Sequence, residues 1–185
     1  MLVTLLRHAE IPSQYQGTYI GHLDVSLSSV GTTSAKKLAT LLENQDFDTV
    51  FCSDLKRAKE SLAFSKYASN ALYTPLLREK SWGRHEGLSF NAIITLENTT
   101  YTDFRTWLDI LDGENYTHFI NRVKMFFLHF LVQSNSKNIL VLTHAGVIRV
   151  LIMLVENISL EEAFSINIPY ANSISLNLET MTIQR

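Results

Sequence analysis

Cysteine, proline and glycine are all scarce in this 185-residue chain, and each shortage excludes a class of protein. Its one cysteine, Cys52, can build neither a disulfide framework nor a cysteine-ligated zinc site within the chain. Three prolines and seven glycines exclude collagen-like and proline-rich linker sequences. A single cysteine fits a reducing compartment, so we expect a cytoplasmic protein.

The chain also lacks an excess of either charge and any long apolar run. Sixteen basic residues against eighteen acidic ones give a net charge of −2, which predicts no nucleic-acid partner. Polar residues interrupt the apolar stretches 123–132 and 147–155, and both are too short to cross a membrane. No nucleotide-binding glycine loop and no histidine metal spacing is present, so we expect neither a cofactor nor a metal.

What is present is an ordinary globular composition, 46% hydrophobic and 18% charged, which predicts one domain over residues 1–185. Short β-prone runs predict strands at 2–6, 48–52, 71–73 and 138–143, and a final hairpin of 172–178 with 181–183. Apolar residues at helical spacing predict helices at 31–42, 55–62 and 147–155. The stretch 90–133 is predicted mostly helical, with a break at Asp112-Gly113. Strands separated by helices indicate an α/β fold, with helices on both faces of a mostly parallel sheet.

Polar side chains follow three of the predicted strands directly. Arg7 and His8 follow the first strand, Ser53 to Arg57 follows the second, and His144 follows strand 138–143. If these strands run parallel, the three groups meet at one edge of the sheet, where ligands of α/β proteins bind. Ser53 and Asp54 are expected to cap the helix that follows, and Ser28 and Ser29 the helix at 31–42.

The residue types at this edge are those that phosphate chemistry needs. An arginine grips phosphate with a fork of donors, and a neutral imidazole can act as a nucleophile. Arg57 sits in the first turn of a helix, where a cation is unfavourable unless an anion binds nearby. Glu79 becomes a proton donor if it lies over such an anion. Each of these residues alone is more often structural, so their joint placement carries the prediction.

Four motifs in order resemble the histidine phosphatase superfamily, also called phosphoglycerate mutase-like. They are Leu6-Arg7-His8-Ala9-Glu10, Cys52-Ser53-Asp54-Leu55-Lys56-Arg57-Ala58, the run from Leu77-Arg78-Glu79 to Gly87, and Thr143-His144-Ala145-Gly146-Val147-Ile148-Arg149. The resemblance implies a three-layer α/β/α sandwich with a helical lid at about 82–136. It also implies that His8 is the nucleophile, that Arg7, Arg57 and His144 complete the phosphate pocket, and that Glu79 is the general acid and base.

The chain departs from the superfamily pattern at several positions. Ala9 replaces a frequent glycine, and Ile11 and Gln14 stand where Thr and Asn are common, so we expect only Gln14 to reach the phosphate. Gly113-Glu114-Asn115 replaces Gly-Glu-Ser before the long lid helix, and His85 replaces a tryptophan of the third motif. His85, Glu86 and His129 are expected to be structural and His118 to be a solvated helix residue, whereas His22 could border the pocket.

The resemblance leaves several functions open. The motifs and length look most like members that hydrolyse α-ribazole 5′-phosphate in cobalamin assembly. The alternatives are a phosphoglycerate mutase, a broad-specificity sugar or nucleotide phosphatase, a phosphatase of phosphohistidine proteins, and a non-catalytic binding module. The expected partner is a small phosphomonoester, and a homodimer is compatible with the sequence. Six aromatic residues either line the pocket against a flat base or belong to the core: Tyr15, Tyr19, Trp82, Phe90, Trp107 and Tyr170.

Overall fold

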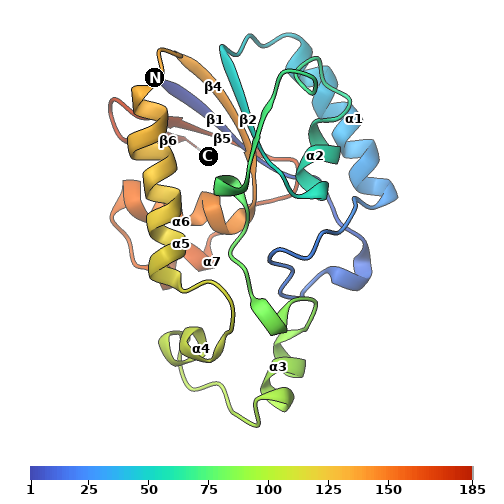
Figure 1. Ribbon diagram of the computed structural model, residues 1–185, viewed down its shortest axis with the longest axis vertical. Helices are drawn as coiled ribbons and strands as arrows, with labels where there is room; N and C mark the ends of the chain where they lie inside the picture. The colour runs from blue at the N-terminus through green and yellow to red at the C-terminus, as the bar shows by residue number, and fades with distance from the viewer. Residues whose placement is uncertain (185) are drawn as a thin grey trace.

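A six-stranded sheet forms the centre of the computed structural model, which describes residues 1–184 (Figure 1). The strands are β1 (Leu2–Arg7), β2 (Thr49–Ser53), β3 (Leu72–Thr74), β4 (Asn138–Thr143), β5 (Ser173–Asn177) and β6 (Thr182–Gln184). Their order is β3-β2-β4-β1-β5-β6. The first four strands in this order are parallel, and the β5–β6 hairpin adds to β1 in antiparallel fashion. The predicted α/β class, the mostly parallel core and the final hairpin are confirmed.

Helices cover both faces of the sheet because its central strands are apolar on both sides. Helices α1 (Ser29–Glu43) and α2 (Lys56–Leu62) pack on the face formed by Leu6, Cys52 and Leu142. Helices α5 (Tyr116–Lys124) and α6 (Ala145–Glu156) pack on the opposite face with Leu5 and Val141. Neighbouring residues such as Leu5 and Leu6 point to opposite faces, as the two-residue repeat of a strand requires. The result is a three-layer α/β/α sandwich.

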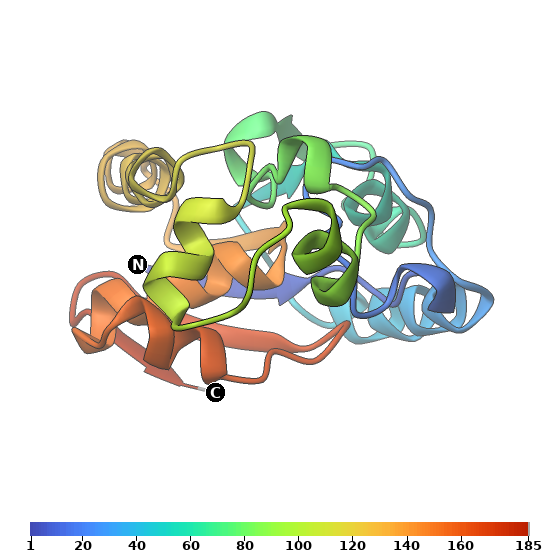
Figure 2. The same ribbon diagram turned by 90° about the horizontal axis from the view of Figure 1, so that it is seen from below.

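The segment 82–136 divides into two parts with different roles. Helices α3 (Phe90–Leu96) and α4 (Phe104–Ile110) lie beyond one end of the sheet (Figures 1 and 2). The chain then returns through α5, a π-helical turn η4 (Met125–Phe130) and a 3₁₀ turn η5 (Leu131–Gln133). Apolar side chains of this second part are buried in the main core: Phe119, Val123, Phe126, Phe127 and Leu131. The predicted lid is therefore too long, because its second half is a core helix.

The helix ends confirm one of the two predicted helix caps and contradict the other. Ser28 caps α1 through its hydroxyl, as predicted. Ser53 and Asp54 do not cap α2; its N-cap residue is Leu55, and Asp24 accepts the hydrogen bond from the Lys56 amide instead. Helix α7 (Leu160–Ser165), which the sequence analysis did not predict, begins with a Ser159–Glu162 capping box. Short 3₁₀ turns η1 (Ser13–Tyr15), η2 (Pro75–Leu77) and η3 (Gly83–His85) occupy loops.

Within residues 1–184, no helix combines the length and the apolar composition that crossing a bilayer requires.

Candidate active site

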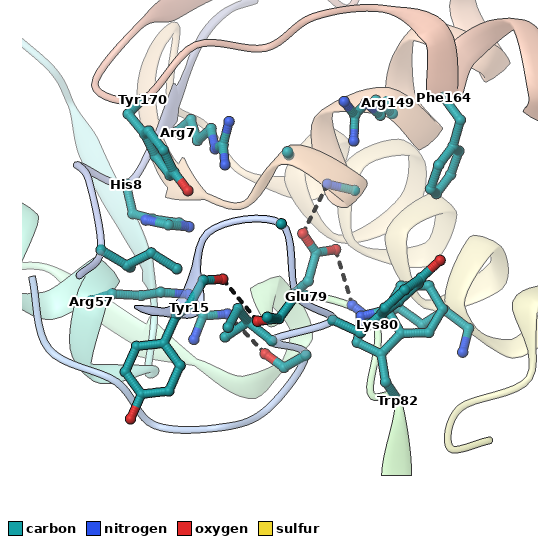
Figure 3. A pocket seen from close by; sticks show the side chains of 18 of the residues that line it. Arg7, His8, Tyr15, Arg57, Glu79, Lys80, Trp82, Arg149, Phe164 and Tyr170 are labelled. Atoms are coloured by element: carbon teal, nitrogen blue, oxygen red, sulfur yellow. Dashed lines mark hydrogen bonds between the residues drawn. The ribbon is translucent and has the colours of Figure 1, made fainter. Parts of the chain in front are cut away.

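A cavity of about 280 Å³ opens at the carboxyl edge of the parallel strands. In the sheet, Arg7 at the end of β1 pairs with Thr143 at the end of β4, and β2 ends beside them. His8, Arg57 and Glu79 line the cavity together with Arg7 (Figure 3). Four of the six predicted site residues therefore meet at its wall, as the parallel topology requires.

His8 presents a ring nitrogen to this cavity. Its Nδ1 lies 2.8 Å from the Ala9 carbonyl oxygen, which can only accept, so Nδ1 carries the proton. The Nε2 lone pair is therefore free. Burial, with the positive charges of Arg57 and Arg7 nearby, holds the pKa of His8 well below its ordinary value. A neutral, oriented imidazole is the form that attacks an electrophile.

Two buried arginines flank His8. Arg57 is 1% exposed and donates to the carbonyls of Gly21 at 2.8 Å and Leu23 at 3.0 Å. Burial lowers its pKa to about 10, so it stays protonated at neutral pH. The Arg7 guanidinium donates to the Ile168 carbonyl and stacks on the Tyr170 ring, with 3.8 Å between its central carbon and the ring centroid. Backbone carbonyls and one ring thus orient both cations without neutralising them.

His144 lies behind His8 and does not itself line the cavity. Its ring centroid is 5.1 Å from that of His8, and its Nε2 is 2.8 Å from the Ser53 hydroxyl. This contact explains why Ser53 does not cap α2. Burial and the charge of Arg57 hold the pKa of His144 well below its ordinary value. Beside the cations Arg7 and Arg57, His144 therefore adds no third positive charge at neutral pH in the free protein. The Nδ1 atom of His144 is buried without a hydrogen-bond partner among residues 1–184.

The backbone fixes Glu79 in the cavity wall. Its Oε2 accepts a hydrogen bond from the Gly146 amide at 3.0 Å, and its Oε1 accepts one from the Lys80 amide at 3.1 Å. The loop that carries it is held from outside, because His22 Nε2 lies 2.9 Å from the Glu79 carbonyl oxygen. Glu79 is thus a carboxylate placed to exchange a proton with a group bound beside His8.

The other residues predicted for the site do not all line the cavity. Gln14 is exposed in η1 and does not line the cavity, so the structure does not bring it to the site. Tyr15, Tyr19, Trp82 and Tyr170 line the cavity, whereas Phe90 and Trp107 do not. Trp107 is buried against Phe90, and its indole nitrogen donates to the Tyr19 hydroxyl at 2.8 Å. Two of the six aromatic residues therefore support the wall from behind.

The remaining polar residues of the third motif are structural. His85 is fully buried, its Nε2 lies 2.8 Å from Glu97 Oε1, and its Nδ1 accepts the Asp112 amide at 3.1 Å. Glu86 Oε1 accepts from the amides of His22 and Trp82 and from the Ser81 hydroxyl. Both residues tie loops together, as expected for side chains without a role in the chemistry.

The sequence analysis missed two cations of the cavity wall, Lys80 and Arg149. Lys80 is 2% exposed, and its ammonium lies 4.1 Å from the Trp82 ring centroid; burial lowers its pKa to about 8. Arg149 donates to the Ile166 carbonyl at 3.1 Å. A signal for Arg149 was present, because a residue three or four positions after Ala145 and Gly146 lies on the same helix face. Lys80 lies in an irregular segment, which offers no such periodicity.

Comparison with known proteins places this geometry in a family. The chain is 33% identical over 156 residues to a probable phosphatase of Schizosaccharomyces pombe, covering 82% of this chain and 71% of that protein. It is 31% identical over 157 residues to the adenosylcobalamin/alpha-ribazole phosphatase of Escherichia coli, covering 82% and 77%. The crystal structure of the alpha-ribazole phosphatase from Shigella flexneri has the same fold, with a TM-score of 0.84, 24% identity, and 99% and 93% coverage. The model of the histidine phosphatase superfamily, branch 1, matches residues 3–184, and the chain belongs to that superfamily.

Proposed function

We propose that this phosphatase hydrolyses a small phosphomonoester through a phosphohistidine on His8, with Glu79 as general acid and base. The observation that carries the proposal is the free Nε2 of a neutral His8 in a cavity that Arg7 and Arg57 make positive. A phosphate dianion repels nucleophiles, and these two guanidinium groups offset that repulsion at the point of attack.

The chemistry proceeds in two displacements at phosphorus. First, with the Glu79 carboxyl in its protonated form, the His8 Nε2 lone pair attacks phosphorus, the phosphorus–oxygen bond to the alcohol breaks, and the departing oxygen takes the proton from Glu79. The positive charge on the His8 ring is stabilised by the Nδ1–H donated to the Ala9 carbonyl. Water then attacks phosphorus, Glu79 takes a proton from that water, and the phosphorus–nitrogen bond breaks. Inorganic phosphate is released, and neutral His8 and protonated Glu79 are restored.

Two kinds of alcohol are candidates for the leaving group. The Escherichia coli relative supports α-ribazole 5′-phosphate, and the rings of Tyr15, Tyr19, Trp82 and Tyr170 offer surfaces for a flat base. The cation Arg149 in the cavity wall favours an alcohol that carries its own negative charge. No divalent cation is needed in either case, because arginines supply the positive charge at the phosphate.

Phosphate release by the wild type and His8→Ala tests the phosphatase proposal. The substrates are α-ribazole 5′-phosphate, 3-phosphoglycerate, a sugar phosphate, a nucleoside monophosphate and p-nitrophenyl phosphate, each with and without a chelator. We expect chelator-resistant turnover, a loss of at least about a thousandfold in His8→Ala, and one phosphoryl group on alkali-quenched wild type by intact mass, because the phosphorus–nitrogen bond of phosphohistidine survives alkali but not acid. Full turnover by His8→Ala contradicts the nucleophile. Lasting phosphoprotein and stimulation by bisphosphoglycerate identify a mutase instead.

A further inference from the structure

Tyr170 places a phenol at the phosphate end of the cavity. Its ring centroid lies 5.6 Å from that of His8, and the central carbon of the Arg7 guanidinium lies 3.8 Å from the same centroid. Tyr170 lines the cavity, and Figure 3 shows its hydroxyl pointing into it beside His8. The hydroxyl of Tyr15, another residue of the wall, points away from His8 in the same view. The Tyr170 phenol therefore stands next to the attacking histidine.

The backbone holds Tyr170 in this position through a strained turn. Ala171 has a φ of +53°, a left-handed conformation that residues other than glycine rarely adopt. Its amide donates to the His8 carbonyl at 3.2 Å, and the Arg7 amide donates to the Asn172 carbonyl at 3.1 Å. Such conformations persist where the surrounding structure fixes them, and they gather at functional sites. The segment that carries Tyr170 is thus tied directly to the segment that carries the nucleophile.

The phenol oxygen of Tyr170 lies near both arginines of the phosphate pocket. Burial lowers the pKa of Arg7 and of Arg57, and the interaction of each with a negative charge on this oxygen opposes the lowering. A hydrogen bond with Tyr170 opposes it further for Arg7. A phosphate held by the two guanidinium groups therefore lies beside the same oxygen.

The proton of the Tyr170 hydroxyl is available to a bound anion. A guanidinium group has hydrogen-bond donors only, so the phenol oxygen accepts from Arg7, and neither arginine takes its proton. A non-bridging oxygen of a phosphoryl group has the lone pairs that this proton needs. A phenol that accepts from a cation and donates to an anion is polarised by both, which strengthens both hydrogen bonds. The hydroxyl thus supplies a donor at the phosphoryl group in addition to the two arginines.

We propose that Tyr170 is a further catalytic residue, whose hydroxyl donates a hydrogen bond to a non-bridging oxygen of the phosphoryl group, in the bound substrate and during its transfer to and from His8. The inference rests on the phosphatase chemistry proposed above. The non-bridging oxygens keep their negative charge through both displacements, so one fixed donor serves both of them. Because this contact involves the part that all phosphomonoesters share, it raises the rate for every leaving group alike.

Tyr170→Phe removes the hydroxyl and keeps the ring, and with it the contact with Arg7. We expect kcat/KM to fall at least about tenfold, the value of one hydrogen bond to a charged group. The factor should be the same for p-nitrophenyl phosphate and for glycerol 3-phosphate, because both carry the same phosphoryl group. Tyr73→Phe, on the exposed edge strand β3, is the control and should retain wild-type values. An unchanged kcat/KM, or a loss confined to one of the two leaving groups, overturns the inference.

Arg7→Lys separates a direct contact from an effect through Arg7. Lysine keeps the charge but not the planar group that stacks on the Tyr170 ring. If the hydroxyl contacts the phosphoryl group itself, adding Tyr170→Phe to Arg7→Lys should lower kcat/KM for p-nitrophenyl phosphate by a further factor of about five or more. Equal values for the single and the double variant mean that the hydroxyl only orients Arg7. Tyr170 is then a positioning residue, and the inference is wrong.

Binding of inorganic phosphate keeps this test separate from the phosphatase proposal. If the wild type turns over p-nitrophenyl phosphate and His8→Ala does not, the phosphatase proposal stands whatever Tyr170→Phe does. Calorimetric titration of inorganic phosphate into His8→Ala, with and without Tyr170→Phe, measures the hydrogen bond without turnover. We expect binding to be about tenfold weaker without the hydroxyl. Equal affinities contradict the inference even in a protein that hydrolyses nothing.

Discussion

Glycine at position 146 lets the Glu79 carboxylate reach the backbone of α6. A β-carbon built at Gly146 lies 2.0 Å from Glu79 Oε1 and 2.9 Å from its Cδ, far inside contact distance. The Gly146 amide is also one of the two donors that hold this carboxylate, at 3.0 Å. Glycine is therefore required at position 146 because the Glu79 carboxylate comes so close to the backbone. The helix itself does not require glycine, since alanine stabilises a helix more than glycine does.

Gly146→Ala is expected to displace Glu79 and to remove its proton transfer. For an alkyl phosphate, kcat/KM, which reports the first displacement only, should fall about a hundredfold or more, the low end of what a general acid contributes. The loss should be much smaller for p-nitrophenyl phosphate, because p-nitrophenolate leaves without a proton. Glu79→Gln is the reference and should show the same dependence on the leaving group. An equal loss on both substrates, or a loss of thermal stability that accounts for the activity, contradicts this reading.

Most residues of the candidate site, but not all, could be placed from the sequence. Arg7, His8 and Arg57 were predictable, because each follows a strand or a helix start that brings it to one edge, whereas Glu79, in a segment predicted to be irregular, was identified by the resemblance to the superfamily. The position of His144 behind His8 was not, since it depends on the hydrogen bond with Ser53. A polar residue at a helix start has two uses, capping the helix or bonding a neighbour, and only tertiary contacts decide between them.

At the scale of elements, α5 holds the loop that carries Glu79. The Arg122 guanidinium on α5 donates to the carbonyl oxygens of Leu76 at 2.8 Å, Arg78 at 2.9 Å and Glu79 at 3.4 Å. Its other face pairs with both carboxylate oxygens of Glu114, at 2.9 Å and 2.7 Å. The second half of the predicted lid thus positions the site from within the core.

Arg122→Lys is expected to loosen this loop while keeping the charge, because an ammonium cannot replace a fork that bridges three carbonyls and a carboxylate. We expect kcat/KM for an alkyl phosphate, which reports the first displacement only, to fall about tenfold, with a smaller loss for p-nitrophenyl phosphate, as for a misplaced Glu79. A purely structural role of Arg122 predicts equal losses on both substrates. Arg105→Lys, on exposed α4, carries the same substitution away from the loop and should retain wild-type values.

Elements with a strong local signal were predictable, and those fixed by tertiary contacts were not. The strand at Asn138–Thr143 has the predicted bounds because its apolar run is continuous and buried. Helix α7 was missed although Ser159 and Glu162 form a capping box, because its six residues contain too little apolar repeat to be seen. The π-helical turn at Met125–Phe130 has no local signature that we recognised.

At the scale of the whole molecule, the sheet order places a pair of buried histidines in its middle. Strands β1 and β4 are neighbours at the centre of the sheet, so His8 and His144 emerge side by side from it. No local pattern predicts that order, because pairing between distant strands depends on the core that they share. The same burial that makes His8 neutral makes the folded state sensitive to acid.

The free energy of unfolding should therefore fall as the pH drops below about 6.5. Burial holds the pKa of His8 and of His144 well below the ordinary value of 6.5, so the unfolded chain binds more protons than the folded one in this range. The two histidines do not lower the free energy of unfolding above about pH 7.5. Below pH 6.5, protonation of each histidine in the unfolded chain lowers the free energy of unfolding by about 1.4 kcal/mol per pH unit. Acidic side chains in ion pairs, such as Asp54, whose pKa is lowered from 3.8, lower the free energy of unfolding only when they are protonated at a still lower pH.

Urea unfolding at pH 7.5, 6 and 5 measures this slope in the wild type, in His144→Gln and in His118→Gln. His144→Gln removes one of the two protons, so its stability should depend on pH less steeply than that of the wild type by about 1.4 kcal/mol per unit. His118 is exposed on α5, and His118→Gln should keep the wild-type slope. A His144→Gln slope equal to that of the wild type means that His144 is protonated in the folded state. In that case it supplies the third positive charge of the phosphate pocket before any substrate binds.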